Sequence, residues 1–247
     1  MSDVEADRGG GVEKGSLVHE AVAAVTEHIR AHGLKVGATL PGENHFANSL
    51  GVSRAVMREA FGKLAALRVI DVANGRKPKV GAIDGSVIGS ALDHAVLTDQ
   101  ISVPDVWDVR RTIEIRTVAL AAQRRTDAEA ARIVELAQAM GAAADLTAVT
   151  RFDIAFHQAI AKASHNALFE QIVRSFSSLM LVAVPTAWNT RVTDEDRREV
   201  LSRHLAVAHA IRDRDPRGAV RAMDDHFDSA VASGLEGVVR RNPTDAS

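Results

Sequence analysis

The chain has 247 residues, of which 46% are hydrophobic and 25% charged, with no cysteine and a net charge of −2. This balance and length favour a folded protein of two domains, and the lack of cysteine excludes disulfides and thiolate metal sites. The acidic start is unlike a secretory signal, and no apolar run approaches the ~20 residues that span a bilayer, so we expect a cytoplasmic protein with no membrane partner.

Charge is unevenly distributed along the chain. Residues 51–80 contain seven basic residues against two acidic ones, a local charge of +5, so the remainder carries −7. A basic segment attached to an acidic body is typical of a module that binds a polyanion.

The first elements in chain order predict a helix-turn-helix. Residues 1–15 are glycine-rich, charged and without a period, which predicts a disordered tail. Helix spacing follows over 17–32, and a Leu-Pro-Gly turn precedes a short helix over 44–50. Ser53 is a suitable N-cap for a third helix over 54–67. The apolar positions of the second and third helices that we expect inside are Phe46, Ala47, Leu50, Val56, Ala60, Leu64 and Leu67.

A β-hairpin is expected after the third helix. Runs typical of strands over 69–72 and 79–80 flank Asn74-Gly75, a dipeptide favoured in hairpin turns because both positions tolerate positive φ. Residues 16–81 therefore predict a winged helix-turn-helix DNA-binding domain with a two-stranded wing. The Gly- and Ser-containing stretch after it predicts a linker, followed by a connecting helix, over 82–102.

The chain beyond the linker has helical periodicity almost throughout. Thr126 and Thr193 are expected to cap two helices, because each precedes acidic residues. The predicted fold is mainly α, with the winged helix-turn-helix followed by an all-α bundle over 103–240 and a tail over 241–247. The helices expected here cover 91–97, 103–124, 127–144, 149–164, 167–184, 193–213 and 216–240.

Basic residues gather on the proposed recognition helix and on the wing. Arg54 and Arg58 are four residues apart and project from one face, where an arginine can donate two hydrogen bonds to guanine. Ser53 and the helix N-terminus can hold a phosphate, and Arg76 and Lys77 of the wing are placed to lie against the DNA backbone or the minor groove. Each charge alone is more readily explained as a solvated surface group, but the ordered combination of turn, capped basic helix and basic hairpin favours DNA.

The segment LPGENHFANSLGVSRAVMREAFGKLAALRVIDVANGRKPKVG, residues 40–81, resembles the DNA-binding domain of the GntR family of bacterial regulators. The motif of that family is close to LP-x-E-x-x-LA-x-x-LGVSR-x-x-VREAL-x-x-L followed by a basic glycine-containing wing. Asn44 departs from it, because many members have arginine at that place. The resemblance implies DNA contacts from Ser53, Arg54, Arg58, Asn74 and Gly75.

Side chains of metal-ligand type recur on inward faces in the C-terminal half. Asp153 and His157 are four residues apart and share an apolar face, while His204 and His226 lie on the apolar seams of two later helices. A single inward histidine is more often a hydrogen-bonded core residue than a ligand. Four such residues on three helices can converge on a divalent cation inside a bundle, so we weigh a metal site against the core interpretation.

Residues 103–240 resemble the all-helical FCD domain of the FadR-type subgroup, in the stretches DVRRTIEIRTVALAA, FDIAFHQAIAKASHNALF, RHLAVAHAI and AMDDHF. The resemblance implies that the effector is a small carboxylate of the hydroxy-acid or sugar-acid type, with sugar acids preferred. Zinc suits such a ligand set, with nickel, manganese or cobalt as alternatives. The divalent metal ligands implied are Asp153, His157, His204 and His226.

Arg110 matches the arginine of the E-x-R-x-x-x-E pattern of that subgroup, although Asp108 replaces the first glutamate. It is a candidate effector-binding residue, because a guanidinium pairs bidentately with a carboxylate. A surface ion pair with Glu114 at i,i+4 spacing explains Arg110 equally well, so both interpretations stay open.

Together these features predict a ligand-responsive transcription regulator and not an enzyme. One recognition helix reads few base pairs, so we expect a homodimer on a palindromic operator. Effector binding is expected to change operator affinity by about 1–3 kcal/mol, with repression relieved by the effector. Two alternatives are a metalloenzyme whose Asp/His cluster activates water and an architectural DNA-binding protein with a structural metal.

Overall fold

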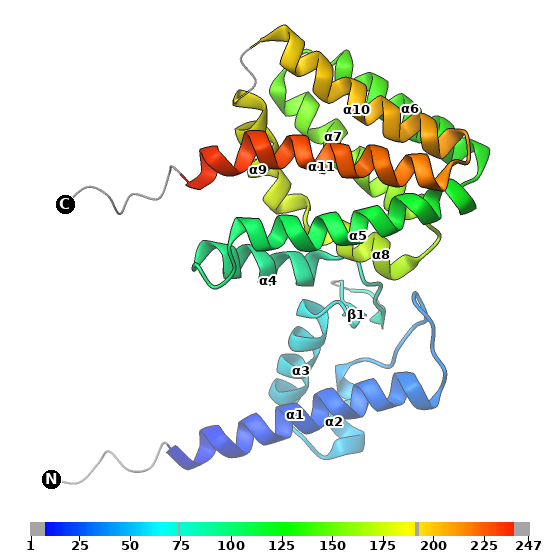
Figure 1. Ribbon diagram of the computed structural model, residues 1–247. Coiled ribbons are helices and arrows are strands. Elements are labelled where there is room, and N and C mark those ends of the chain that lie inside the picture. Colours follow the sequence, from blue (N-terminus) through cyan, green and yellow to red (C-terminus); the bar gives the residue numbers. More distant parts are fainter. Residues whose placement is uncertain (1–7, 74, 191–192, 240–247) are drawn as a thin grey trace, which may run out of the picture. The chain divides into compact units, whose positions relative to one another are not determined.

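The computed structural model describes residues 8–73, 75–190 and 193–239, and its chain divides into two compact units, Met1–Val87 and Ile88–Ser247 (Figure 1). The boundary between the units falls within the segment 82–102 that was expected to connect two domains. The expected tail over 241–247 lies outside the described residues.

The N-terminal unit holds three helices and a hairpin: α1 (Arg8–Ala31), α2 (Glu43–Leu50), α3 (Arg54–Ala66), β1 (Ile70–Asp71) and β2 (Lys79–Val80). Helix α3 packs against α1 and α2. Helix α1 begins at Arg8, so the expectation of a tail over 1–15 is wrong from residue 8 onward; once a helix has formed, each added residue gains a hydrogen bond. The core of this unit includes Val18, Val25, Leu40, Phe46, Met57, Phe61, Leu64 and Ile70.

The wing of this unit is a short antiparallel pair in which Ile70 faces Val80 and Asp71 faces Lys79. The chain segment before α2 extends the pairing, since the Val80 N–H donates to the Ala38 carbonyl at 2.8 Å. The predicted runs over 69–72 and 79–80 contain both strands, and residues 72–78 join them because β1 ends at Asp71.

Two apolar positions expected in the core of this unit are exposed instead. Leu50 is 40% exposed and Leu67 is 57% exposed. Leu50 is the last residue of α2 and Leu67 is the C-cap of α3. Side chains at helix ends leave the packed face, so this part of the core prediction is wrong.

The C-terminal unit is made of helices. Thr126 and Thr193 cap two of them as predicted, each accepting a backbone N–H with its side chain, from Glu129 and Asp196 respectively. The elements are α4 (Ser86–Leu97), α5 (Val103–Arg124), α6 (Asp127–Gly141), α7 (Leu146–Ala163), α8 (Ala167–Ser175), α9 (Ser177–Asn189), α10 (Asp194–Arg212) and α11 (Pro216–Val239).

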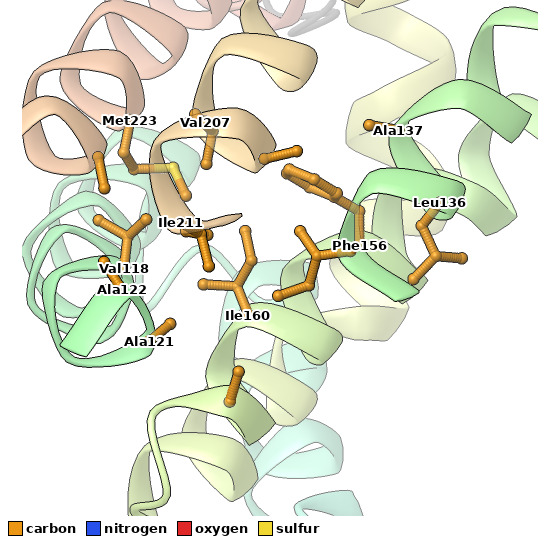
Figure 2. Packing of buried hydrophobic residues seen from close by; sticks show 14 of the residues in the cluster. Val118, Ala121, Ala122, Leu136, Ala137, Phe156, Ile160, Val207, Ile211 and Met223 are labelled. Atoms are coloured by element: carbon orange, nitrogen blue, oxygen red, sulfur yellow. The ribbon is translucent and has the colours of Figure 1, made fainter. Parts of the chain in front are cut away.

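Helices α5, α6, α7, α10 and α11 enclose the core of this unit. Helix α11 packs against α5 and α10, and α6 packs against α7 and α10. Figure 2 shows apolar side chains from these five helices meeting in the interior, among them Phe156, Ile160, Ile211 and Met223, all fully buried. The predicted fold, a winged helix-turn-helix with an all-α C-terminal bundle, is therefore confirmed.

Two helices begin earlier than the sequence predicts. Helix α4 begins at Ser86, within the expected linker, because Asp84 accepts hydrogen bonds from the Ser86 amide at 3.0 Å and from its hydroxyl at 2.6 Å. Helix α7 begins at Leu146 because Asp145 accepts the Ala148 amide at 2.8 Å. Local caps of this kind are favoured at helix starts.

The single helix expected over 167–184 is wrong, because the chain bends by 55° between α8 and α9. The hydroxyls of Ser175 and Ser177 donate to the carbonyls of Ile172 and Arg174, at 2.7 and 2.6 Å. Such bonds compete with the regular helical pattern. Within the described residues, no single helix is long and apolar enough to cross a membrane; α8 and α9 meet that criterion only as a bent pair.

Candidate metal centre and DNA-binding surface

The structure brings the four predicted metal ligands together inside the C-terminal unit. Asp153 and His157 come from α7, His204 from α10 and His226 from α11, and all four side chains are buried. The three imidazoles each place a ring nitrogen within 4.8 Å of the others. The Asp153 carboxylate borders them, with Oδ1 3.1 Å from His204 Nε2 and 3.9 Å from His157 Nε2.

His157 presents a free nitrogen to this cluster. Its Nδ1 contacts the carboxylate of Glu114, a residue of α5 that is 1% exposed. Because an ionised carboxylate only accepts hydrogen bonds, Nδ1 carries the proton and Nε2 keeps a lone pair. That Nε2 is buried and has no hydrogen-bond partner among the described residues. A buried acceptor without a partner is costly, and a bound cation would satisfy it.

His204 is oriented in the same way. Its Nδ1 lies 2.8 Å from the Val200 carbonyl, which can only accept, so Nε2 of the neutral ring carries a lone pair. This lone pair faces Asp153 Oδ1 at 3.1 Å. Two acceptors so close are stable only with a proton or a metal ion between them. The donor set of three imidazoles and one carboxylate therefore fits a divalent cation.

The charge states in the cluster suit metal ligation. Burial, followed by the neighbouring His204 and His157, lowers the pKa of His226 well below its usual value, so the ring is neutral near pH 7. Burial alone would raise the pKa of Asp153, but the contact with His204 and the nearby His157 and Arg110 hold it well below the usual carboxyl range. Neutral imidazole and ionised carboxylate are the forms that bind metals.

Arg110 forms the ion pair with Glu114 that the sequence left as one alternative, but the pair is buried rather than on the surface. Nε of Arg110 donates to Glu114 Oε1 at 2.5 Å, and the two side chains are 3% and 1% exposed. Burial raises the pKa of Glu114, but the Arg110 charge and His157 outweigh burial and lower it. The guanidinium also lies 5.0 Å from the centre of the Trp107 ring.

Arg110 and the four predicted ligands line one small cavity of about 40 Å³. The rest of its wall is apolar apart from the indole N–H groups and consists of Trp107, Met140, Val149, Ala183, Val184, Ala187, Trp188 and Val200. The effector-binding role of Arg110 is thus compatible with its position, next to the cluster and tied to Glu114.

Glu114 was not predicted as part of the site. A signal was available, because Glu114 lies four residues before Val118 and seven before Ala121, both fully buried in α5. That spacing places the carboxylate on the inward stripe of the helix. Periodicity alone could not show that His157 would be its partner.

The predicted DNA-binding residues lie on the surface of the N-terminal unit. Ser53 caps α3, its side chain accepting the Val56 amide at 3.2 Å. Arg54 and Arg58 are exposed on α3, and within the described residues neither has an ion-pair partner. Below them Val56, Met57 and Ala60 are buried, so the helix presents the two arginines to solvent.

The wing carries the remaining predicted DNA-binding residues. Gly75 has φ +71° and the Arg76 amide donates to the Ala73 carbonyl at 3.1 Å, which closes a turn at the tip. Arg76 and Lys77 are exposed. Asn74 lies outside the described residues.

A capped basic helix, a wing and a helical C-terminal unit together define a winged helix-turn-helix regulator. Residues 17–80 match the model of the bacterial regulatory proteins of the gntR family, and residues 105–229 match the FCD domain. The chain belongs to the GntR family of DNA-binding transcriptional regulators and carries an FCD domain, as its sequence motifs indicated.

Curated relatives extend over most of the chain. The Glc operon transcriptional activator of Escherichia coli (strain K12) is 31% identical over 215 residues, 84% of this chain and 85% of that protein. LutR of Bacillus subtilis (strain 168), an HTH-type transcriptional regulator, is 34% identical over 62% of this chain and 70% of its own. The transcriptional repressor NanR of Salmonella newport (strain SL254) is 27% identical over 83% of this chain and 80% of its own.

A solved structure shares the fold. The GntR protein of Streptococcus agalactiae superimposes with a TM-score of 0.64 and 24% sequence identity, covering 88% of this chain and 100% of that one. This likeness supports the architecture of the two units.

Proposed function

We propose that this protein is a ligand-responsive regulator that binds an operator through α3 and the wing and senses a small carboxylate at a divalent metal ion in its C-terminal unit. The observation that carries the sensing half is the buried cluster of His157, His204 and His226, in which the Nε2 of His157 has no hydrogen-bond partner among the described residues.

In the DNA-binding half, Arg54 and Arg58 contact base edges in the major groove and Ser53 contacts a phosphate. The wing tip, with Gly75, Arg76, Lys77 and Asn74, contacts the DNA backbone or the minor groove. Because one α3 reads few base pairs, two copies of the chain bind a palindromic operator as a homodimer. A DNA partner also places the protein in the cytoplasm.

In the sensing half, Asp153, His157, His204 and His226 hold the ion. Zinc is the preferred metal, with nickel, manganese and cobalt as alternatives, because imidazole and carboxylate ligands suit all four. When bound, the ion supplies open coordination positions for carboxylate oxygens of a hydroxy-acid or sugar-acid effector. Arg110 then holds the effector carboxylate, while Glu114 fixes the orientation of both Arg110 and His157.

The proposed direction of control is repression relieved by the effector. A dimer on an operator can block transcription by occupancy alone, which needs no contact with the transcription machinery. Among the relatives, one is named an activator and another a repressor, so direction is decided by experiment. Effector binding changes operator affinity through a coupling of about 1–3 kcal/mol.

The test measures operator affinity of the metal-loaded protein by fluorescence anisotropy, using a palindrome selected from random DNA. We expect an effector found by thermal-shift screening of carboxylic acids to weaken operator binding about 5- to 150-fold. The variant His204→Ala should keep operator affinity and lose the response. Unchanged operator affinity with saturating effector would overturn the sensing role, and turnover of the acid would support the metalloenzyme instead.

A further inference from the structure

A second, larger cavity adjoins the metal pocket inside the C-terminal unit. It has a volume of about 440 Å³ and lies between α4, α5 and α9. Trp107 and Ala183 line both cavities, so these two side chains form the wall that the cavities share. The size is that of pockets that bind small organic molecules.

The lining of the larger cavity is apolar in practice. Its polar side chains are already engaged within the chain, since Ser178 donates to Asp93 at 2.8 Å and Thr186 donates to the Val182 carbonyl at 2.8 Å. The other side chains of the lining include Val96, Leu97, Val103, Val106, Leu179 and Met180. A group lying here would find hydrocarbon and few free donors or acceptors.

The metal pocket is too small for a polyhydroxylated acid. Its volume of about 40 Å³ holds about three water molecules, enough for a carboxylate group and little more. Apart from the predicted ligands, Arg110 is the only charged side chain that the described residues contribute to its lining, and Nε of Arg110 is committed to Glu114. Within this pocket the hydroxyls of a sugar acid would find few partners, which opposes burying them there.

We propose that the cavity between α4, α5 and α9 receives an apolar tail of the effector, so that the effector is a carboxylic acid with a hydrocarbon or aromatic substituent rather than a sugar acid. This inference rests on the proposed sensing function and names the class of acid that it detects. The carboxylate lies near Arg110 and the histidine cluster, and the tail passes between Trp107 and Ala183. On one side of this wall, Trp107 is held by Arg110 and Phe227. On the other side, Ala183 has only a methyl group as its side chain.

The experiment compares three acids by titration calorimetry on the full-length, zinc-loaded protein: lactate, 2-hydroxyoctanoate and gluconate. Lactate and 2-hydroxyoctanoate share the coordinating groups and differ only in the apolar tail. We expect 2-hydroxyoctanoate to bind at least tenfold more tightly than lactate, because apolar surface is buried, and gluconate to bind most weakly. Tightest binding by gluconate overturns the tail subsite and leaves the sensing function standing. If none of the three acids binds, the sensing function fails, and the subsite with it.

Two variants test whether the apolar tail of the effector lies in the cavity between α4, α5 and α9. Ala183→Phe places a larger side chain in the wall between the two cavities. It should reduce the ratio of the affinities for 2-hydroxyoctanoate and lactate to less than threefold. Leu181→Phe is the matched control, because Leu181 lies on the same helix, is 61% exposed and lines neither cavity. An unchanged preference in Ala183→Phe overturns the proposal. A changed sedimentation coefficient of Ala183→Phe with an unchanged preference for 2-hydroxyoctanoate also overturns the proposal. It would show that the cavity is an interface between copies of the chain.

Discussion

Glu114 joins the Arg110 guanidinium to the His157 imidazole, and all three side chains are buried. A carboxylate that holds the far nitrogen of a metal-binding histidine fixes its tautomer and orientation, and such partners contribute strongly to metal affinity. The same carboxylate neutralises the buried charge of Arg110. One residue therefore supports both the proposed metal ligand and the proposed effector-binding residue.

We expect Glu114→Gln to weaken zinc binding about 10- to 100-fold, because the amide no longer holds the Nδ1–H of His157 as strongly. The change also leaves Arg110 charged and unpaired in the interior, at a cost of about 3–5 kcal/mol in stability. The double variant Arg110→Met/Glu114→Gln should recover stability and keep the weak metal affinity. Calorimetric titration with zinc and urea unfolding measure the two effects.

The matched control for this prediction is Glu135→Gln, which removes a carboxylate on α6 whose side chain is 63% exposed. It should leave zinc affinity and stability unchanged. Zinc affinity at the parent level in the folded double variant would show that Glu114 has no positioning role.

Alanine substitutions at Gly81 and Gly62 are expected to change the free energy of unfolding in opposite directions. A Cβ on Gly81 would overlap the backbone oxygen of Arg68, whereas a Cβ on Gly62 of α3 meets nothing within 4 Å. We expect Gly81→Ala to destabilise the protein by about 1–3 kcal/mol through overpacking. Gly62→Ala should stabilise it by about 0.5–1 kcal/mol, since alanine favours a helix interior. Urea unfolding followed by circular dichroism checks both; equal shifts in the two variants would contradict the close approach at Gly81.

At the scale of elements, helix α3 has one face that packs in the core and an opposite face that is exposed and basic. Its buried residues pack against α1 and α2, and the opposite face exposes Arg54 and Arg58 beside the Ser53 cap. The wing supplies charge at a turn whose strand pairing is only two residues long. We therefore propose that α3 reads the bases and that the wing contributes binding that is independent of sequence.

We expect Arg54→Ala or Arg58→Ala to weaken operator binding about 5- to 150-fold and to relax sequence preference, because each removes a contact to a base edge. Lys77→Ala should weaken binding to all DNA sequences alike and reduce the salt slope by about 0.9. Lys63→Ala is the control, since Lys63 lies at the other end of α3 and pairs with Glu59 at 3.5 Å. Anisotropy titrations at several salt concentrations measure these effects; loss of binding in Lys63→Ala equal to that in Arg54→Ala would contradict the assignment.

At the scale of the whole molecule, three helices that are distant in sequence contribute to one buried cluster. Because α7, α10 and α11 each provide an imidazole, a bound ion would link them and stabilise the bundle. This stabilisation is available only to the folded chain, since the unfolded chain does not hold the ligands together.

Removal of metal should therefore lower the unfolding temperature and abolish the effector response, while operator binding itself persists. The free energy gained at a metal concentration 1,000 times Kd is about 4.1 kcal/mol. His226→Ala should behave like the chelated protein. His165→Ala is the matched control, because His165 pairs with Glu129 at 3.0 Å near the surface, away from the cluster. Calorimetric scans with and without a chelator check this; an unfolding temperature independent of zinc would refute the site.

Sequence periodicity determined most of the helices and the class of fold, because an amphipathic pattern and a capping residue act locally. The capping boxes at Thr126 and Thr193 formed as predicted. The sequence did not predict the bend after Ser175, because α8 and α9 have continuous apolar character. The hydrogen bonds from the serine hydroxyls to backbone carbonyls leave no periodic signal in the sequence. The early start of α4 depends on a single side chain, Asp84.

The sequence by itself also determined the family, the capped basic helix α3 and the four ligand-type residues, because motifs preserve residue type and spacing. Only the tertiary structure decided that Asp153, His157, His204 and His226 meet, since they come from three helices whose packing no local pattern encodes. It also decided that Glu114 pairs with His157 and that Arg110 is buried with it. Convergence of distant side chains is a property of packing, and packing is non-local.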